Sequence, residues 1–477
     1  SELLEHLPSS TFKQTIKEFQ RITRDYILIS VPYRENLNLR ILLMTRKILF
    51  LAYYFPPLGG GGAIRPVKFI KYLWQSNWHP IVITSRTENY YALDYTGFND
   101  LPNSLIVQRT PEFNLLPVYE WLYKFRLDGL AHFLRRHESR FLLPDRQMGW
   151  FRSALKAGLD ICKEENIDLI FSTAPPYTCH LIARSLKHRT SLPWIADFRD
   201  EWSDYGFIRW GGIARFFQKK MEKQVLQVAD KITTTTSWIS QNFQEKIKAA
   251  QNKIYTITNG FDPEDFTNLP IDSFNNKKLV LTHAGSFYGQ RTPREFLQAL
   301  NSLIRSNLIG KNEIEINFLG PKPSIKALSE FNLQLSSIKF WGYRSHRQAL
   351  QQLSQSTALI LIQSEEGYRC IPGKTYEYLA LGKPILAIVP EFSAVKKLLK
   401  EKDGIYFADI NNIETIRQTL YRLYRDWKRG LLKLKIQHRG LENFSYPRLV
   451  ERLINLFNEV CEDDKPQRNV ARVIKGV

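Results

Sequence analysis

The sequence predicts an α/β protein made of two successive units, each with a core of parallel strands. Three observations support this prediction. Short apolar runs alternate with longer helical patterns, a polar and turn-rich stretch interrupts this alternation past the middle of the chain, and 477 residues exceed what one ordinary core needs. Because parallel βαβ units bind ligands at the carboxyl ends of their strands, we expect two Rossmann-like domains that face each other across a cleft.

The first unit is expected over residues 47–267. Apolar runs predict its strands at residues 47–53, 80–84, 167–172, 194–197, 231–235 and 253–258. Amphipathic patterns with helical spacing predict helices at residues 64–74, 177–189 and 213–229. The turn signal Asn259-Gly260-Phe261-Asp262-Pro263 and the polar stretch at 268–278 then separate this unit from the next.

The second unit is expected over residues 268–445, with strands at 279–283, 313–319, 338–341, 358–361 and 384–388 and helices at 293–305 and 374–381. An amphipathic helix at 446–460 opens the last segment, 446–477, which ends in a basic tail. Residues 1–46 form a polar, irregular extension without the pattern of a signal peptide. A natural start near Met44 and a genuine helical extension fit equally well. Because the first apolar strand begins at Lys47 and no earlier residues show a core-facing pattern, residues 1–43 are expected to be dispensable for stability and donor binding.

The net charge and the spacing of cysteines and histidines restrict which binding partners and cofactors the protein is expected to have. The chain carries 67 Lys and Arg against 47 Asp and Glu, a formal net charge of +20, which suits nucleic acid, an anionic membrane or a phosphorylated substrate. No nucleic-acid-binding fingerprint occurs, so nucleic acid is not expected as a partner. The four cysteines lack CxxC spacing and the histidines lack HxxxH or HExxH spacing, so we expect neither a disulfide framework nor a metal site. This composition favours a reducing cytoplasm.

Four glycines, Gly59–Gly62, directly follow the first strand and precede the first helix. Glycine lets backbone N–H groups approach a ligand closely, and a helix N-terminus favours anions. We therefore predict that this loop, and Gly61 and Gly62 in particular, faces the ligand. The spacing of the glycines is not that of a dinucleotide-binding loop. The alternative to a ligand-facing loop is a flexible connection without a binding role.

Charged residues cluster at the end of the strand at 194–197. Asp197, Arg199 and Asp200 stand where α/β proteins place their chemistry, so they are candidate catalytic residues. The alternative is an Asp–Arg ion pair that holds the loop.

The matching place in the second unit carries a small-residue turn followed by a cation. Gly285 and Ser286 follow a strand, and Arg291 comes just before a helix. A fixed guanidinium can clamp phosphate oxygens, so all three residues are candidates for binding a phosphorylated donor. A solvated residue at the helix cap is the alternative for Arg291.

The most specific motif spans residues 372–384. Pro-Gly opens a helix, Gly382 ends it, and Pro384 starts a strand. The N-terminus of this helix offers free N–H groups to a diphosphate, and Glu377 lies on the same side as Lys374. An ordinary Lys–Glu surface pair explains these two residues, but it does not explain the Pro-Gly before them or the Gly-Lys-Pro after the helix. The predicted donor-binding residues are Gly373, Lys374, Thr375 and Glu377.

Together these segments resemble the family 4 glycosyltransferases, retaining enzymes with the two-domain GT-B fold. The closer resemblance is to the branch that builds bacterial polysaccharides and lipid-linked oligosaccharides. It rests on the segments 54–57, 172–176, 197–202, 259–262 and 372–384, which occur in family order within residues 47–457. The resemblance implies a nucleoside diphosphate sugar as donor, a glycan or lipid-linked acceptor, and no metal cofactor, because protein cations and helix dipoles neutralise the diphosphate.

The resemblance also implies roles for the candidate residues. Arg291, Lys374 and the helix N-terminus at Gly373 would stabilise the departing diphosphate, and Glu377 would accept both ribose hydroxyls. The Gly59–Gly62 loop and residues 197–200 would frame the acceptor and the reacting carbon.

Two departures from the family pattern keep alternatives open. Arg369 stands where the family usually carries a first glutamate that contacts the donor sugar. The usual lysine shortly after Arg291 is also absent, which leaves Lys374 or Arg294 as a substitute. A catalytically silent sugar-nucleotide-binding subunit and a sugar-nucleotide epimerase are therefore the competing functions.

Residues 119–150 combine aromatic rings with arginines, among them Trp121, Tyr123, Phe125, Phe133 and Phe141. Such a face suits peripheral attachment to an anionic membrane surface, which here would be the inner, cytoplasmic face. A helix pair that packs its aromatic rings inward on the acceptor side fits the same residues equally well.

Overall fold

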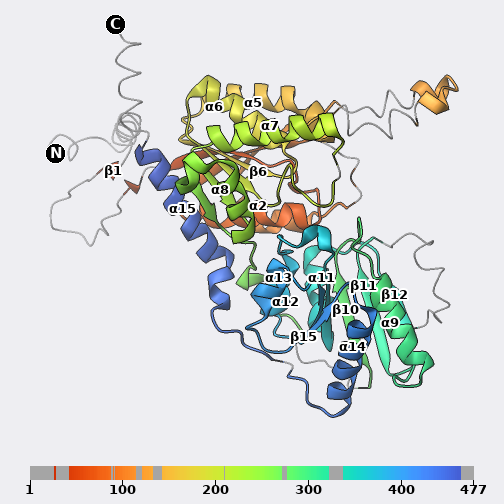
Figure 1. Cartoon of the computed structure of the whole chain (residues 1–477). Helices are drawn as coiled ribbons and strands as arrows, with labels where there is room; N and C mark the ends of the chain where they lie inside the picture. Colours follow the sequence, from red (N-terminus) through yellow and green to blue (C-terminus); the bar gives the residue numbers. More distant parts are fainter. Residues whose placement is uncertain are drawn as a thin grey trace, which may run out of the picture.

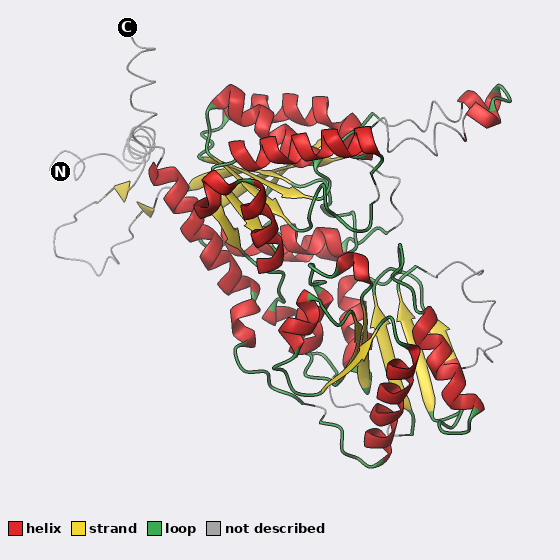
Figure 2. Cartoon of the chain, in the orientation of Figure 1, coloured by secondary structure: helices red, strands yellow, loops and turns green. Residues whose placement is uncertain are grey.

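A computed structural model describes residues 26–27, 42–43, 45–86, 90, 92–113, 121–130, 132, 142–208, 210–270, 277–321, 337–433 and 435–463. It contains two α/β domains, one above the other in Figure 1, and each has a parallel sheet between layers of helices. Figure 2 shows the two sheets as separate sets of yellow strands. The predicted fold class, two Rossmann-like domains, is confirmed.

The sheet of the N-terminal domain has the strand order β5-β4-β3-β6-β7-β8-β9, with all neighbours parallel. The direction of winding reverses between β3 and β6, and such a switch point opens a crevice at the carboxyl ends of the strands. The strands are β3 (Arg46–Leu51), β4 (Trp78–Ser85), β5 (Ile106–Thr110), β6 (Leu169–Ala174), β7 (Trp194–Phe198), β8 (Lys231–Thr234) and β9 (Ile254–Thr256).

Helices cover both faces of this sheet. One face carries α5 (Phe151–Glu164), α6 (Thr178–Thr190), α7 (Gly212–Val228) and α8 (Ser237–Lys246), and the other carries α2 (Gly61–Trp74) and α15 (Tyr446–Asp463). Side chains of β3 alternate between the two cores, as the period of two in a strand requires, so that Leu49 joins the first and Phe50 the second.

The last helix, α15, belongs to the core of the N-terminal domain. Leu449, Leu453 and Phe457 are fully buried, and the Phe457 ring lies 5.2 Å from that of Trp78. The chain therefore passes through the C-terminal domain and returns to the N-terminal one, as the blue helix beside α2 and α8 in Figure 1 shows.

The sheet of the C-terminal domain has the order β12-β11-β10-β13-β14-β15, again fully parallel. Its strands are β10 (Leu279–Ala284), β11 (Ile314–Leu319), β12 (Ile338–Phe340), β13 (Ala358–Ile362), β14 (Ile385–Val389) and β15 (Ile405–Asp409). One face packs α9 (Arg294–Arg305) and α14 (Ile413–Lys428), and the other packs α11 (His346–Ser354), α12 (Lys374–Ala380) and α13 (Ala394–Leu399).

Several elements were not expected from the sequence, including β5, α5, α14 and β15. Both strands lie at sheet edges, where one side is unpaired, and β5 has only two apolar residues, Ile106 and Val107, followed by three polar ones instead of an apolar run. The remaining short elements are η1 (Thr96–Asp100), η2 (Arg146–Trp150), η3 (Lys248–Lys253), η4 (Pro263–Phe266), η6 (Glu365–Gly367) and η7 (Leu441–Phe444).

The N-terminal extension lies mostly outside the described residues. Its described part is an antiparallel pair of two-residue strands, β1 (Tyr26–Ile27) and β2 (Leu42–Leu43), which joins neither parallel sheet. None of the described helices combines the length and apolar character that a membrane-spanning segment requires.

Candidate active site

A cavity of about 760 Å³ lies between the two domains, at the carboxyl ends of both sheets. Residues that follow β3 and β7 line it from one side, and residues that follow β10 or belong to α12 line it from the other. The sequence-predicted site residues that share this cavity are Gly61, Gly62, Arg199, Asp200, Gly285, Ser286, Arg291, Gly373, Lys374 and Glu377. Asp197 and Thr375 do not line it.

The glycine loop makes a close contact between the domains. The Gly60 backbone N–H donates to the Tyr343 hydroxyl over 3.1 Å, and a Cβ on Gly59 would lie only 2.1 Å from that oxygen. Gly60 also has a φ of 85°, a conformation that favours glycine. The glycines therefore let a tyrosine of the C-terminal domain approach the start of α2 across the cavity.

Arg199 fastens the glycine loop to the end of β6. Its guanidinium donates to the backbone carbonyls of Gly62, Pro175 and Ala174. Asp200, the next residue, is half-buried on the same wall of the cavity. Burial raises the pKa of the Asp200 carboxyl, although Arg199, the Cys370 thiol and Arg291 act in the opposite direction. This wall of the cavity therefore carries a carboxyl group with a raised pKa directly after the arginine that holds the glycine loop.

The structure does not fit the predicted catalytic role of Asp197, because its carboxylate is fully buried, does not line the cavity and is occupied by hydrogen bonds. Arg65 grips it with two hydrogen bonds of 2.8 and 3.1 Å, and the hydroxyls of Thr173 and Thr233 each donate over 2.7 Å. Burial opposes ionisation, but Arg65 and these hydrogen bonds outweigh it and lower the pKa of Asp197. Asp197 does form an ion pair, but its partner is Arg65 of α2 and not an arginine of the same cluster.

Arg291 brings a cation to the cavity without a carboxylate partner among the described residues. Its guanidinium donates to the Tyr288 hydroxyl over 3.0 Å and lies 4.8 Å from the centre of that ring. The Phe207 ring, which comes from the N-terminal domain, lies 5.3 Å away. Arg291 is only 7% exposed, and its buried Nε has no hydrogen-bond partner in the described part of the chain. Aromatic rings thus hold a guanidinium that still lacks an anion.

Lys374 is the second cation of this wall, and His283 orients it. The carbonyl of Ile360 can only accept, so the His283 Nδ1 that lies 2.9 Å from it carries the proton. Nε2 is then free to accept from the Lys374 Nζ, 3.1 Å away, and Nζ also donates to the Ala284 carbonyl over 2.8 Å. Burial and the nearby Arg291 hold the pKa of Lys374 well below its usual range, against the attraction of Glu377.

Of the two candidates to replace the missing family lysine, only Lys374 lines the cavity. Arg294 is exposed at the start of α9 and does not line the cavity, whereas the Lys374 Nζ lies close to Gly285 on the cavity wall. Thr375, one of the predicted donor-binding residues, does not line the cavity. It is fully buried, because one step along a helix turns a side chain by about 100° and only residues three or four apart share a face.

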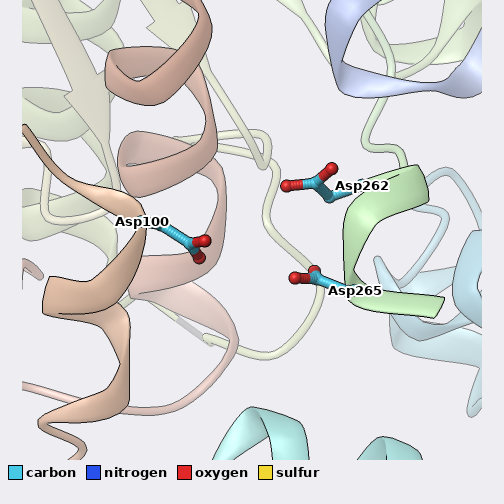
Figure 3. A group of neighbouring side chains, drawn as sticks. All are labelled: Asp100, Asp262 and Asp265. Carbon is cyan, nitrogen blue, oxygen red and sulfur yellow. The ribbon is translucent and has the colours of Figure 1, made fainter. Parts of the chain in front are cut away.

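An acidic cluster borders the cavity where the two domains meet. Asp100, Asp262 and Asp265 bring carboxylate oxygens within 4.8 Å of one another, as a metal site would (Figure 3). The Lys68 ammonium donates to all three, over 2.8, 2.8 and 2.7 Å, and Lys71 adds a contact of 2.7 Å to Asp262. The ammonium groups of Lys68 and Lys71 therefore occupy the position that a metal ion would take between these carboxylates.

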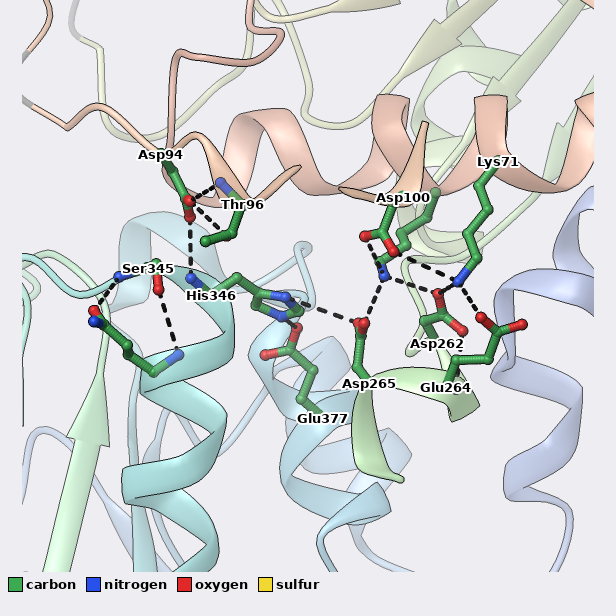
Figure 4. Close-up of polar contacts among 12 residues, drawn as sticks. Lys71, Asp94, Thr96, Asp100, Asp262, Glu264, Asp265, Ser345, His346 and Glu377 are labelled. Carbon is green, nitrogen blue, oxygen red and sulfur yellow. Dashed lines mark hydrogen bonds and ion pairs between the residues drawn. The ribbon is translucent and has the colours of Figure 1, made fainter. Parts of the chain in front are cut away.

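Glu377 faces the cavity in contact with His346, a residue that the sequence analysis missed. The His346 Nε2 lies 2.7 Å from Oε1 of Glu377, and Nδ1 lies 3.8 Å from Oδ2 of Asp265 (Figure 4). The backbone N–H of His346 donates to Asp94 of the N-terminal domain over 3.1 Å. Burial lowers the pKa of His346, but Glu377 and Asp265 outweigh burial and raise it.

A local signal for His346 was present in the sequence. Ser345 and Gln348 form a capping box, in which the serine hydroxyl and the glutamine side chain satisfy each other's backbone N–H groups. Ser-x-x-Gln after a predicted strand indicates a helix start at the carboxyl end of that strand, which is where a cleft residue is expected.

Position 369, where the family pattern places a glutamate, forms a contact between the domains. The Arg369 guanidinium pairs with Glu201 over 2.9 Å, and Asn242 donates to the same carboxylate oxygen over 2.6 Å. The backbone carbonyl of Arg369 accepts from Thr236 over 2.7 Å. Arg369 does not line the cavity, so this chain brings no carboxylate to it from that position.

Comparisons with known proteins agree with this arrangement. A family model described as Glycosyltransferase Family 4 matches residues 60–265, and one described as Glycosyl transferases group 1 matches residues 278–426. The two matches divide the chain where its two sheets divide. No curated protein sequence matches the chain.

Several solved structures share the fold at low identity. Sucrose-phosphate synthase from Thermosynechococcus elongatus has a TM-score of 0.61 at 14% identity, over 87% of this chain and 99% of its own. A glycosyltransferase from Rickettsia africae has a TM-score of 0.58 at 13% identity, over 87% and 98%. Anabaena HepE in complex with UDP and glucose has a TM-score of 0.57 at 12% identity, over 87% and 100%.

The two facing Rossmann-like domains, with a cavity between the ends of their strands, define a protein of the GT-B fold. Because a glycosyltransferase domain is matched in each half, the chain is a GT-B glycosyltransferase.

Proposed function

We propose that the protein transfers a sugar from a nucleoside diphosphate sugar, with retention of configuration, onto a glycan or lipid-linked acceptor. The observation that carries the proposal is the pair Arg291 and Lys374. Both line the cavity, and neither has a carboxylate in ion-pair contact among the described residues. A buried cation without an anion is unfavourable, and a diphosphate supplies the missing charge.

The same pair provides a catalytic advantage. As the bond between sugar and diphosphate breaks, negative charge grows on the diphosphate, so fixed cations stabilise the transition state more than the bound donor. Because Arg291 and Lys374 supply this charge, we propose that turnover needs no divalent metal. Solved structures of HepE with UDP and with UDP-glucose support a donor of this kind.

The opposite wall suits the reacting carbon and the acceptor. Asp200 lies there with a raised pKa, and Arg199 holds the glycine loop beside it. Glu377 also lines the cavity, and we propose that it binds the ribose. One of its oxygens already contacts His346, so the second oxygen and a remaining lone pair are left for the hydroxyls.

Two features support a second candidate function, that of a catalytically inactive subunit that binds a sugar nucleotide. Arg369 replaces the expected glutamate, and its pairing with Glu201 removes it from the sugar. The same donor site would then bind a nucleotide sugar without turning it over.

A donor turnover assay with purified protein separates these functions. We expect loss of the intact nucleoside diphosphate sugar, insensitivity to EDTA, and an α- or β-linked product that matches the donor anomer by NMR. The Arg291→Ala/Lys374→Met double variant should lose turnover, whereas the surface variant Phe392→Ser should keep it. Binding without turnover would identify the silent subunit, and an epimerised nucleotide sugar would identify an epimerase.

We further propose that the protein works in polysaccharide or lipid-linked glycan synthesis, on the cytoplasmic face of a membrane. The net charge of +20 supports attachment to an anionic surface.

A further inference from the structure

The first half of α7 exposes a row of large apolar side chains. Ile213 is 79% exposed, Phe216 64% and Phe217 44%. Their spacing of three and four residues places them on one side of the helix. Ala214, Gln218, Glu222 and Val225 share the opposite side and are buried, so α7 packs normally on the sheet and presents a second apolar face outward.

The exposed charges within residues 212–223 all have one sign. Arg215, Lys219, Lys220 and Lys223 are exposed on the same stretch. The one acidic residue between positions 212 and 223, Glu222, is 1% exposed and accepts from the Ser203 hydroxyl and from Lys246. The outward surface of residues 212–223 therefore combines apolar rings with cations alone.

This surface lies close to the cavity. Tyr205 and Phe207 line the cavity, and Ile208, the next residue, is 41% exposed. Ile213 follows Phe207 by six residues, which span at most about 21 Å even when fully extended. A partner held on α7 would therefore sit beside the cleft.

We propose that residues 212–223 of α7, together with Ile208, dock on an anionic lipid surface. Exposed phenylalanines flanked by lysines and arginines suit the headgroup level, where rings enter the apolar boundary and cations meet lipid phosphates. A second copy of the chain fits this face poorly, because two such surfaces would bring eight cations together. The proposal rests on the proposed function, since it makes the acceptor one that is held at the membrane beside the cleft.

Residues 121–130 offer a rival surface. Trp121 and Phe125 are 55% and 57% exposed, whereas Trp150, at the end of the sequence-predicted membrane face, is fully buried and donates to Thr110. Phe133 and Phe141 lie outside the described residues. The exposed rings of residues 121–130 are therefore tested separately from those of α7.

The test is co-sedimentation of the full chain with phosphatidylcholine vesicles, with and without phosphatidylglycerol. The parent protein should bind only the anionic vesicles, and less as salt rises. Phe216→Ser/Phe217→Ser should weaken binding at least about tenfold. Lys219→Gln/Lys220→Gln/Lys223→Gln should weaken it on the order of a hundredfold. Both should keep the melting temperature and donor turnover of the parent, since none of these residues lines the cavity.

Matched changes on the C-terminal domain serve as controls. Phe392→Ser removes a ring that is 82% exposed, and Lys397→Gln/Lys400→Gln removes exposed charge. Neither should alter vesicle binding. The proposal is overturned if the α7 variants bind vesicles like the parent, or if only Trp121→Ser/Phe125→Ser loses binding. A parent that ignores vesicles but dimerises through α7 would also overturn it. Vesicle binding that persists in a protein without donor turnover would contradict the proposed function and leave the docking surface intact.

Discussion

His346 lies between two carboxylates that both line the cavity, with 2.7 Å from its Nε2 to Oε1 of Glu377 and 3.8 Å from its Nδ1 to Oδ2 of Asp265. On the other side, Asp265 belongs to the stretch that links the domains and also accepts from Lys68 of α2. The first backbone N–H of α11 is meanwhile bound by Asp94. The residue proposed to bind the donor ribose is therefore connected to the N-terminal domain through one imidazole.

Glu377→Ala should weaken nucleotide binding by about ten- to a hundredfold, because charge-assisted hydrogen bonds contribute roughly 1.5–3 kcal/mol. Titration calorimetry with nucleoside diphosphates measures this directly. Glu391→Ala, which removes an exposed carboxylate outside the cavity, is the control. An unchanged dissociation constant for Glu377→Ala would show that the ribose lies elsewhere.

The raised pKa of His346 predicts a pH-dependent contribution to stability. Since Glu377 and Asp265 favour the protonated ring in the folded state, the stabilisation is complete below the ordinary value of 6.5. It is lost as the pH rises through the folded-state value. The melting temperature of the parent should therefore exceed that of His346→Gln at acidic pH, and the difference should shrink on going alkaline. The exposed His188→Gln change is the control, and a difference that stays constant with pH would refute the charged imidazole.

Arg291→Ala should lower kcat more than it weakens nucleotide binding. The diphosphate carries most charge in the transition state, so the guanidinium contributes most there. Steady-state rates beside nucleotide titration give both quantities, and Arg294→Ala, on the exposed start of α9, is the matched control. Full turnover in Arg291→Ala would mean that the donor diphosphate binds elsewhere.

The fold and most of the cavity were accessible from the sequence because each signal was local. The glycine loop, Arg291 and the Pro372–Pro384 frame follow predicted strands, and parallel topology brings the ends of those strands to one edge. What failed depended on contacts between distant segments. Asp197 reads as catalytic by its place after a strand, but its partner Arg65 lies 132 positions away. The pairing of Arg369 with Glu201 spans 168 positions and has no local signature.

Asp197→Asn should destabilise the protein by about 3–5 kcal/mol, because it leaves the buried guanidinium of Arg65 without its charge partner. Chemical denaturation followed by circular dichroism measures the change. The Arg65→Met/Asp197→Asn double variant should recover part of the loss, since both charges are then gone. A variant Asp197→Asn that folds as stably as the parent but has no turnover would restore the catalytic role that the sequence suggested.

Lys374 should take up a proton when a nucleoside diphosphate binds. In the empty cavity, burial and Arg291 hold its pKa well below the usual range, so a fraction of the amine is neutral at alkaline pH. A diphosphate beside Nζ favours the ammonium, and the pKa rises on binding.

Titration calorimetry in buffers with different ionisation enthalpies reports this uptake as a difference in apparent binding enthalpy. The uptake should grow as the pH rises and should disappear in Lys374→Met, while Arg291 still provides residual affinity. His283 has no proton to give in this exchange, because its Nδ1–H is bound to the Ile360 carbonyl and its Nε2 accepts from Nζ. If the apparent enthalpy of the parent is the same in every buffer at every pH, the Lys374 amine does not meet the diphosphate.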